Sequence, residues 1–353
     1  MICVESELGD GMTKLKNKRI LIIGGTGSLG QALIRREAHL NELFITSRDE
    51  AKHWTIRNRL PQGSNVNFLV ADIRDSVRME RVIREVRPQV IVLAAALKQV
   101  DTCEKSPYES VQTNLIGISN IVETVLNLES ELSELEAVLM VSTDKACAPT
   151  NVYGMSKAIS ERIVTSATPK YGSTKFLAVR YGNVLESRGS IIPLFRMRAQ
   201  NSLSLTITHK EMTRFIMTLD QSIDLIEETI ISGQSGEIWL PKLESMKIID
   251  LANIFSTRYK LNVEIIGMRP GEKLHEELVS EPESIRVVEN KEYFKMLPSL
   301  TQINANKKIF NYSSKDYIMD ANDLEEYLSN LGIFEKSMSS FVGREIDEIM
   351  VPK

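Results

Sequence analysis

Cysteine and long apolar runs are both scarce in this chain of 353 residues. Its three cysteines are an odd number without a C-x-x-C pair, which excludes a disulfide framework and gives no zinc motif. The longest apolar run, residues 90–97, is far shorter than the roughly 20 residues that a membrane-spanning helix needs. We therefore expect a protein of a reducing compartment, the cytoplasm, without a membrane segment.

Charge of one sign does not dominate either. The chain carries 43 basic and 47 acidic side chains, for a net charge of −4, so it has no overall attraction for nucleic acid or an anionic membrane. We expect neither as a partner, and any phosphate recognition must be local. Hydrophobic residues at 42% and charged residues at 25% are typical of a globular protein, and the length suits about two domains.

Short β-branched runs alternate with helix-length amphipathic stretches in the first half of the chain. The pattern predicts strands at 20–23, 43–46, 66–70, 90–93, 138–142 and 176–181. Strands that alternate with helices form right-handed βαβ units with a parallel sheet, and the purely apolar run at 90–93 is typical of a strand covered on both faces. We predict an α/β fold with a doubly wound parallel sheet over residues 18–185.

The alternation of strand and helix patterns ends at about residue 185. Longer irregular stretches follow, and they contain most of the prolines. Helical spacing returns at 222–231, 248–255 and 323–331. We predict a smaller, mostly helical lobe over residues 186–335, with some segments returning to the sheet. Residues 1–17 are expected to form a flexible leader and residues 336–353 a tail.

A glycine-rich turn follows the first predicted strand. The sequence GGTGSLG at 24–30 lies between that strand and a predicted helix. Gly24, Gly27 and Gly30 permit a tight turn, close approach to a pyrophosphate and close packing of helix on strand. Because strand, turn, helix and second strand have suitable spacing, we prefer a Rossmann-like dinucleotide site to a simple turn. The candidate cofactor residues here are Gly24, Thr26, Gly27, Ser28, Leu29 and Gly30.

The residues after the second predicted strand indicate which dinucleotide binds. Ser47 and Arg48 are placed to hold a 2′-phosphate, which favours NADP, whereas Asp49 on a ribose hydroxyl would favour NAD. Arg48 as a solvated surface charge is the third interpretation. We favour NADP, with NAD as the alternative. The predicted cofactor site also includes Asp72, Ile73, Ala94, Ala95, Ala96 and Asn114.

A catalytic candidate lies within residues 142–157. Tyr153 and Lys157 are four residues apart and share a helix face, so the Lys157 ammonium can lower the pKa of the phenol and hold a nicotinamide ribose. Tyr153 is then a candidate base for alcohol oxidation. Cys147 has no histidine nearby in sequence and is interpreted as a packing residue. His209 and His275 lack a partner at metal-ligand spacing, so no metal is predicted.

Six sequence blocks carry a resemblance to a known family. They are GGTGSLG, LAAALKQVD, STDKACAPTNVYGMSK, RYGNVLESRGSIIP, MTRFIMTLD and GMRPGEKLHEEL. From about residue 18 to 335 the chain resembles the extended short-chain dehydrogenase/reductases, and most closely the configuration-inverting UDP-N-acetylglucosamine 4,6-dehydratases of the polysaccharide biosynthesis proteins. It departs at Ile23, where threonine is usual, and at Leu93, where histidine is common. Tyr153 separates it from the large membrane-bound retaining relatives, which have methionine there.

The resemblance implies a nucleotide-sugar lyase. Oxidation of carbon 4 to a ketone acidifies the proton on carbon 5, which makes loss of the 6-hydroxyl feasible. Tyr153 would take the 4-hydroxyl proton while hydride moves to NADP, with Thr143 bound to the same oxygen. Lys145 would be the base at carbon 5 and Asp144 the acid for the leaving hydroxyl. Lys145 must then be neutral and Asp144 protonated, and we expect burial to shift both groups that way.

The rest of the cycle and the substrate contacts also follow from the resemblance. Hydride returns to carbon 6 and carbon 5 is reprotonated from the opposite face, which gives UDP-2-acetamido-2,6-dideoxy-β-L-arabino-hexos-4-ulose for 6-deoxy-amino-sugar synthesis. The second lobe would bind UDP, with Arg214 and Arg269 on the phosphates and Glu272 on the ribose. Asn183 would contact the first phosphate or the sugar, and Lys98 the sugar or the nicotinamide; each is alternatively a structural ion-pair residue. A homodimer or homohexamer is expected.

Two other functions remain open on the same residues. A UDP-sugar 4-epimerase or a 4-keto-sugar reductase would keep Tyr153 and Lys157 but would not need the adjacent Asp144 and Lys145. That pair would then be a surface ion pair on a loop. A catalytically silent NADP-binding regulator would not need any of the four. Because all four are present, the sequence favours the dehydratase.

Overall fold

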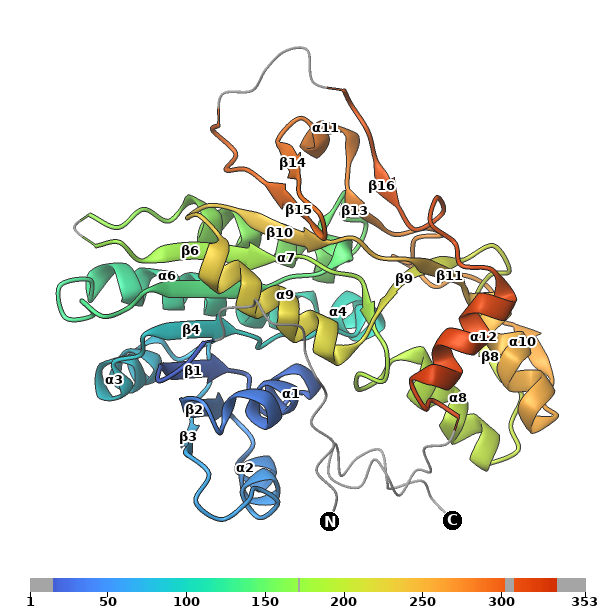
Figure 1. The fold of residues 1–353 in the computed structure, drawn as a ribbon, viewed down its shortest axis with the longest axis horizontal. Helices are drawn as coiled ribbons and strands as arrows, with labels where there is room; N and C mark the ends of the chain where they lie inside the picture. The colour runs from blue at the N-terminus through green and yellow to red at the C-terminus, as the bar shows by residue number, and fades with distance from the viewer. Residues whose placement is uncertain (1–14, 171, 302–307, 335–353) are drawn as a thin grey trace.

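A large, mostly parallel sheet forms the centre of the molecule in the computed structural model, which describes residues 15–170, 172–301 and 308–334 (Figure 1). Within those ranges the sheet has nine strands in the order β14-β15-β10-β6-β5-β4-β1-β2-β3. Strands β1 to β6 and β10 run parallel, and β15 and β14 are antiparallel additions at one edge. Their bounds are β1 Arg19–Ile23, β2 Glu42–Ser47, β3 Val66–Val70, β4 Val90–Leu93, β5 Ala137–Val141, β6 Lys175–Val179, β10 Ile238–Pro241, β14 Val287–Glu289 and β15 Tyr293–Met296.

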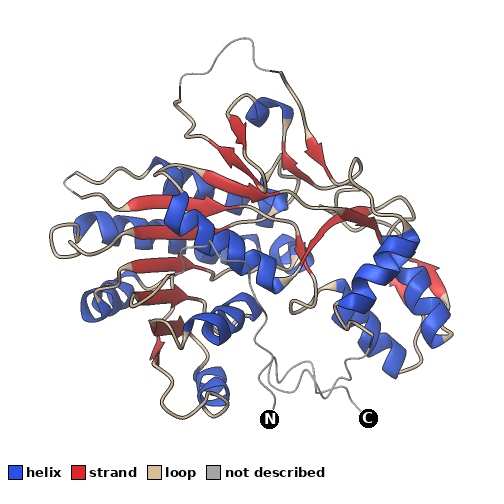
Figure 2. Cartoon of the chain, viewed as in Figure 1, coloured by secondary structure: helices blue, strands red, loops and turns tan. Residues whose placement is uncertain are grey.

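Helices cover both faces of this sheet (Figure 2). Helices α3, α6 and α7 pack together on one face, while α1 and α9 pack together on the other. The bounds are α1 Ser28–Glu37, α2 Glu50–Arg57, α3 Ser76–Val86, α6 Gly117–Asn127, α7 Val152–Ser166 and α9 Leu219–Ser232. The α/β fold with a doubly wound sheet is therefore confirmed, and the six predicted strands lie within two residues of the observed ones.

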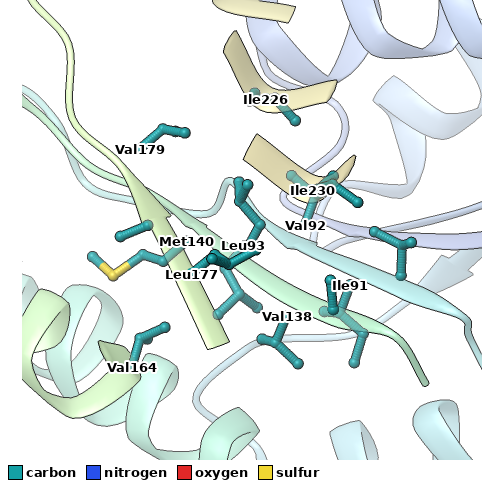
Figure 3. Close-up of a cluster of buried hydrophobic side chains, with 14 of the residues drawn as sticks. Ile91, Val92, Leu93, Val138, Met140, Val164, Leu177, Val179, Ile226 and Ile230 are labelled. Carbon is teal, nitrogen blue, oxygen red and sulfur yellow. The ribbon is translucent and has the colours of Figure 1, made fainter. Parts of the chain in front are cut away.

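The core consists of the apolar strand side chains and the helix faces that cover them. All four residues of β4 are buried, because neither face of that strand meets water. Figure 3 shows side chains of the central strands between those of α7 on one side and α9 on the other. The labelled residues are Ile91, Val92, Leu93, Val138, Met140, Val164, Leu177, Val179, Ile226 and Ile230.

The second lobe has its own apolar cluster, built around Phe195, Phe255 and Leu324. Two of the predicted helices, 248–255 and 323–331, occur there as α10 and α12. The lobe also contains α8 and several short strands that the sequence pattern does not predict. The elements are α8 Ile191–Gln200, α10 Ile248–Tyr259, α12 Ala321–Asn330, the sheet of β7 Asn183–Val184, β9 Thr213–Met217 and β11 Ser245–Lys247, and the pairs β8 Leu205–Ile207 with β12 Val263–Ile265 and β13 Glu277–Val279 with β16 Tyr312–Ser313. Helix α9 and strands β10, β14 and β15 belong instead to the central sheet layer.

The remaining elements are short and connect the sheet to its surroundings. They are α4 Val100–Lys105, α5 Pro107–Val111, the π-helix η1 Gln112–Ile116, the 3₁₀ turn η2 Asp144–Ala146 and α11 Glu281–Ser284. Within the described ranges no helix is both long and apolar enough to cross a membrane. The predicted leader at 1–17 and tail at 336–353 lie almost wholly outside those ranges.

The topology brings distant residues to one edge of the sheet. Parallel strands end on the same side, so the turns after β1, β2, β3, β4, β5 and β6 all meet there. The second lobe, with α8, α10 and α12, lies at one end of the strands (Figure 1). A cavity between the strand ends and this lobe contains the candidate site.

Candidate active site

A cavity of about 750 Å³ runs along the carboxyl ends of the strands. With one exception, every residue that the sequence predicts for the cofactor, the substrate or catalysis lines it. The lining includes the glycine turn, residues 47–49 after β2, residues 94–98 after β4, the catalytic stretch after β5 and residues 269–272 of the second lobe. The exception is Asn114.

Asn114 is fully buried behind the cavity and does not line it. Its side-chain oxygen accepts a hydrogen bond from the backbone N–H of Leu97 at 2.8 Å, and its amide nitrogen donates to the Leu97 carbonyl at 2.9 Å. The prediction that Asn114 contacts the cofactor is corrected: both ends of its amide are used to fix the segment after β4. Its role is to hold the cavity wall at residues 94–98.

Three glycines of the first turn differ in the space around their Cα atoms. Gly24 has φ +87°, and a Cβ there would lie 2.5 Å from Ala95 Cα, so only glycine fits. A Cβ on Gly30 would lie 2.3 Å from the Gly25 carbonyl oxygen, so the helix packs directly on the turn. A Cβ on Gly27 would meet no atom nearer than 3.6 Å, which leaves the cavity side of Gly27 open. That space suits the backbone approach of a phosphate.

The first turn of α1 is suited to an anion. Gly27 is its N-cap, no side chain caps it, and no acidic residue occurs in its first turn. The first backbone N–H groups of a helix have no partner inside the helix and carry partial positive charge. A pyrophosphate can satisfy them, so the residues present fit a dinucleotide.

The region after β2 presents a carboxylate, Asp49, and a guanidinium, Arg48, to the cavity. Asp49 caps α2 by accepting from Lys52 N at 3.0 Å, and Lys52 Nζ lies 3.3 Å from the same carboxylate, so this carboxylate is already used. Arg48 remains 55% exposed at the cavity and lies 3.8 Å from Asp72. Asp72 is also bound by Arg74, at 2.7 Å, and these cations hold the pKa of its carboxyl below the ordinary value despite burial.

Tyr153 and Lys157 lie on the first turns of α7, as the spacing predicts. Asn151 caps this helix by accepting from the Gly154 N–H at 2.8 Å. Burial raises the pKa of Tyr153 to about 12, while the Lys145 cation and a hydrogen bond with Thr143 act in the opposite direction. Burial lowers the pKa of Lys157 to about 8, and its Nζ donates to the Val141 carbonyl at 2.6 Å. The Lys145 cation thus favours the phenolate, while the Lys157 amine is bound to the Val141 carbonyl.

Four charged side chains cluster beside Tyr153. Lys145 Nζ lies 3.0 Å from Asp144 Oδ1 and 3.2 Å from Glu276 Oε1, and Arg214 Nε lies 3.8 Å from the same Glu276 oxygen. The residues Asp144 and Glu276 are each only 1% exposed. Sequence reasoning missed Glu276, although it belongs to the block GMRPGEKLHEEL, which carries part of the resemblance.

The charge states in this cluster are only partly as predicted. Burial raises the pKa of Asp144, as expected. Burial also disfavours the Lys145 ammonium, but the carboxylates of Asp144 and Glu276 outweigh it and hold the pKa of Lys145 above its ordinary value. The expectation that burial makes Lys145 neutral is wrong for this arrangement, because a second carboxylate, unseen in the sequence, faces the amine.

The second-lobe candidates form a wall opposite the strand ends. Arg214 donates to the carbonyls of Thr213 at 2.7 Å and Lys273 at 3.1 Å, so its guanidinium also holds the segment that carries Glu276. Arg269 is 53% exposed, and its backbone N–H donates to Glu272 at 3.0 Å. The Gly271 carbonyl accepts from Asn151 at 2.8 Å, which docks this turn against the start of α7.

The loop after β7 connects the glycine turn with the segment after β4. The Arg188 N–H donates to Ser28 Oγ at 3.0 Å, and Lys98 Nζ donates to the Arg188 carbonyl at 2.5 Å. Nearby, Asn183 Oδ1 is buried at the cavity and lacks a hydrogen-bond partner among the described residues. Buried acceptors are nearly always satisfied, so this oxygen fits a ligand donor.

In the part of the chain that the structure describes, no three histidine, cysteine or acidic side chains form a group that could hold a metal ion. Cys147 is buried, and its thiol donates to Glu283 at 3.4 Å, as a packing residue would. His275 is hydrogen-bonded to Thr213 at 2.8 Å, and His209 accepts from the Glu211 N–H at 3.1 Å. Cys3 lies outside the described residues.

Known proteins resemble this chain along most of its length. The family described as polysaccharide biosynthesis protein matches residues 20–298. A Methanocaldococcus jannaschii relative named an uncharacterized membrane protein is 38% identical over 314 residues, which cover 85% of this chain and 92% of the relative. The UDP-N-acetylglucosamine 4,6-dehydratase (inverting) of Campylobacter jejuni is 34% identical over 293 residues, 81% of this chain and 85% of the relative.

Another relative and one solved structure complete the comparison. A UDP-glucose 4-epimerase of Rickettsia rickettsii is 36% identical over 292 residues, 79% of this chain and 83% of the relative. The X-ray structure of Pen from Bacillus thuringiensis superposes with a TM-score of 0.83 at 30% identity, covering 90% of this chain and 98% of that one. Dehydratases and epimerases thus both occur among the similar proteins.

Proposed function

Because this chain belongs to the polysaccharide biosynthesis protein family, with the fold of the extended short-chain dehydrogenase/reductases, we propose that it is a UDP-N-acetylglucosamine 4,6-dehydratase that inverts carbon 5. The observation that carries this proposal is the pairing of the buried Asp144 with the half-buried Lys145 beside Tyr153 in one cavity. An epimerase needs Tyr153 and Lys157 but not this pair, whereas elimination of water also needs a base and an acid.

The cofactor we propose is NADP. A nicotinamide supplies a reversible hydride acceptor, which oxidation at carbon 4 and reduction at carbon 6 both require. The first turn of α1 would hold its pyrophosphate, and Arg48 its 2′-phosphate. Tyr153 would act as a phenolate that the Lys145 cation beside it stabilises, and it would take the proton of the 4-hydroxyl and become the neutral phenol.

Elimination requires a different distribution of protons from the one the free cavity favours. Lys145 is held as an ammonium by two carboxylates, but its Nζ donates to Asp144 at 3.0 Å. Transfer of one proton along this hydrogen bond turns the ammonium and carboxylate into an amine and a carboxylic acid. Lys145 can then take the carbon 5 proton while Asp144 protonates the leaving hydroxyl. The two groups end as ammonium and carboxylate, so the starting state is restored.

Arg48→Glu is expected to weaken NADP binding about tenfold or more and to leave NAD nearly unchanged, because a charge-assisted contact to phosphate is worth about 1.5–3 kcal/mol. Titration of the protein with each cofactor, followed by calorimetry, measures this. Arg59→Glu, at an exposed position outside the cavity, is the matched control. An unchanged preference in Arg48→Glu would remove Arg48 from the cofactor site.

The direct test uses proton NMR of the protein with UDP-N-acetylglucosamine and NADP in deuterated water. We expect a 6-deoxy-4-ketone of L-arabino configuration with deuterium at carbon 5. A D-xylo ketone would keep the dehydration but contradict the inversion. Appearance of UDP-N-acetylgalactosamine without a ketone would make the protein an epimerase, the reaction named for its R. rickettsii relative.

A further inference from the structure

We infer that Glu276 is a positioning residue for Lys145, an inference that rests on the proposed dehydratase function. Its carboxylate holds the Lys145 amine between two acidic groups and controls where the proton of that amine resides. Glu276 has no role in the sequence prediction, and it comes from the second lobe, so it couples the substrate wall to the acid and base after β5.

The geometry places Glu276 in direct contact with the proposed base. Glu276 Oε1 lies 3.2 Å from Lys145 Nζ, almost as near as Asp144 Oδ1 at 3.0 Å. The segment leading to Glu276 is fixed by Arg214, which donates to the Lys273 and Leu274 carbonyls. The Glu276 N–H itself donates to Ser314 Oγ at 3.0 Å. The carboxylate therefore has a defined position beside the amine.

Two buried oxygens in this cluster lack hydrogen bonds, which points to function rather than stability. Glu276 Oε2 and Asp144 Oδ2 have no partner among the described residues, although both side chains line the cavity. A buried carboxylate oxygen without a partner costs free energy. Apolar residues of similar size would avoid that cost. A second acid beside Lys145 is therefore explained by what it does to the amine.

The proton balance gives Glu276 its task. Asp144 and Glu276 carry two negative charges and Lys145 and Arg214 two positive ones, so the buried cluster is neutral as a whole. When one proton moves from Lys145 to Asp144, Glu276 stays ionised, 3.8 Å from Arg214. Its charge favours the protonated form of Asp144 and the charged form of Lys145 alike. Glu276 thus keeps one proton shared between Asp144 and Lys145, and the elimination uses this proton.

The groups that face Lys145 predict the direction of the effect. They are Asp144 on its own turn, Glu276 from the second lobe, Arg214 on β9 and Tyr153 on α7. Only the two carboxylates raise the pKa of the Lys145 amine, while Arg214 lowers it. Removal of one carboxylate charge must lower that pKa, and it must lower the pKa of Asp144 as well, because Glu276 raises it.

Glu276→Gln tests the inference, because it keeps the size of the side chain and removes the charge. The loss of an opposite charge within about 4 Å shifts a pKa by about one to three units, so the neutral fraction of Lys145 at pH near 8 should rise at least about tenfold. Peptide mass spectrometry after brief treatment with acetic anhydride measures this as faster acetylation of Lys145. In turnover, both limbs of the pH profile for carbon 5 deuterium incorporation should move to lower pH.

Two variants distinguish this charge effect from a structural defect. Glu277→Gln is the matched control, because Glu277 accepts from Asn311 and lies outside the cavity lining. It should leave acetylation of Lys145 unchanged, and Glu276→Asp, which keeps the charge, should restore slow acetylation. If Glu276→Gln and Glu277→Gln label Lys145 as slowly as the native protein, the inference is overturned while ketone formation by the native protein still supports the proposed function. Absence of any ketone with the native protein overturns both.

Discussion

Lys145→Ala is expected to abolish dehydration of UDP-N-acetylglucosamine while oxidation at carbon 4 persists. Loss of a general base costs about 10²–10⁴-fold in rate, and here the variant also loses the proton that Asp144 must receive. Tyr153 and the cofactor residues remain in place, so hydride removal from carbon 4 is still possible. The variant should therefore stop at the 4-ketone that keeps its 6-hydroxyl.

Absorbance of the reduced nicotinamide and proton NMR of the sugar separate the two steps. Lys145→Ala should build up reduced cofactor without a 6-deoxy product. Because the Lys145 cation lowers the pKa of Tyr153 against burial, oxidation by the variant should also need a higher pH than oxidation by the native protein. Tyr153→Phe is the comparison variant and should lose both steps. A Lys145→Ala protein that forms the 6-deoxy-ketone at the native rate would exclude Lys145 as the base.

The central sheet could be predicted because its strands are continuous apolar runs. Strand β4, Val90–Leu93, has no polar residue, and its position between amphipathic helices leaves few alternatives. The short strands of the second lobe differ. Strand β12 has three residues, two of them exposed, and it pairs with β8, which lies far away in the sequence. Such a strand shows no alternation of its own, and only the folded lobe defines it.

The site was predictable where the sequence itself sets the geometry. Tyr153 and Lys157 line one cavity because their spacing places them on one face of α7, and Gly24 is a glycine because Ala95 lies against it. Asn114 was misplaced, because nothing in the sequence shows that its amide is used by Leu97. Glu276 was missed, and with it the charge on Lys145. Both errors concern contacts between segments that are distant in the chain.

A buried ion cluster beneath the site gives the largest expected effect on stability. Arg180 is 1% exposed and binds Glu161 on α7 at 2.6 Å and Glu283 on α11 at 2.9 Å. It also donates to the Leu278 carbonyl at 2.9 Å. The guanidinium thus connects the catalytic helix to the second lobe. Burial alone would raise the pKa of Glu283, but the Arg180 cation and hydrogen bonds from Ser280 hold it at about 2.

Arg180→Leu is expected to lower the free energy of unfolding by about 3–5 kcal/mol, because it leaves two buried carboxylates without their cation. Urea unfolding at pH 7 measures the loss. Arg84→Leu is the control, since Arg84 pairs with Glu80 and Glu131 at the surface, where ion pairs contribute little. Glu161→Gln and Glu283→Gln combined with Arg180→Leu should recover part of the stability, because they remove the unpaired charges.

The same cluster can be tested by whether the free energy of unfolding rises or falls as the pH is lowered. In the native protein the pKa of Glu283 is depressed from 4.5 to about 2, so its contribution to stability is present above pH 4.5 and is lost as the pH falls towards 2. In Arg180→Leu burial acts on Glu283 without its cation and raises the pKa of its carboxyl. Protonation then relieves a buried charge, so the variant should become more stable as the pH falls from 7. A variant that loses stability over that range, as the native protein does on further acidification, would show that Arg180 does not set the charge state of Glu283.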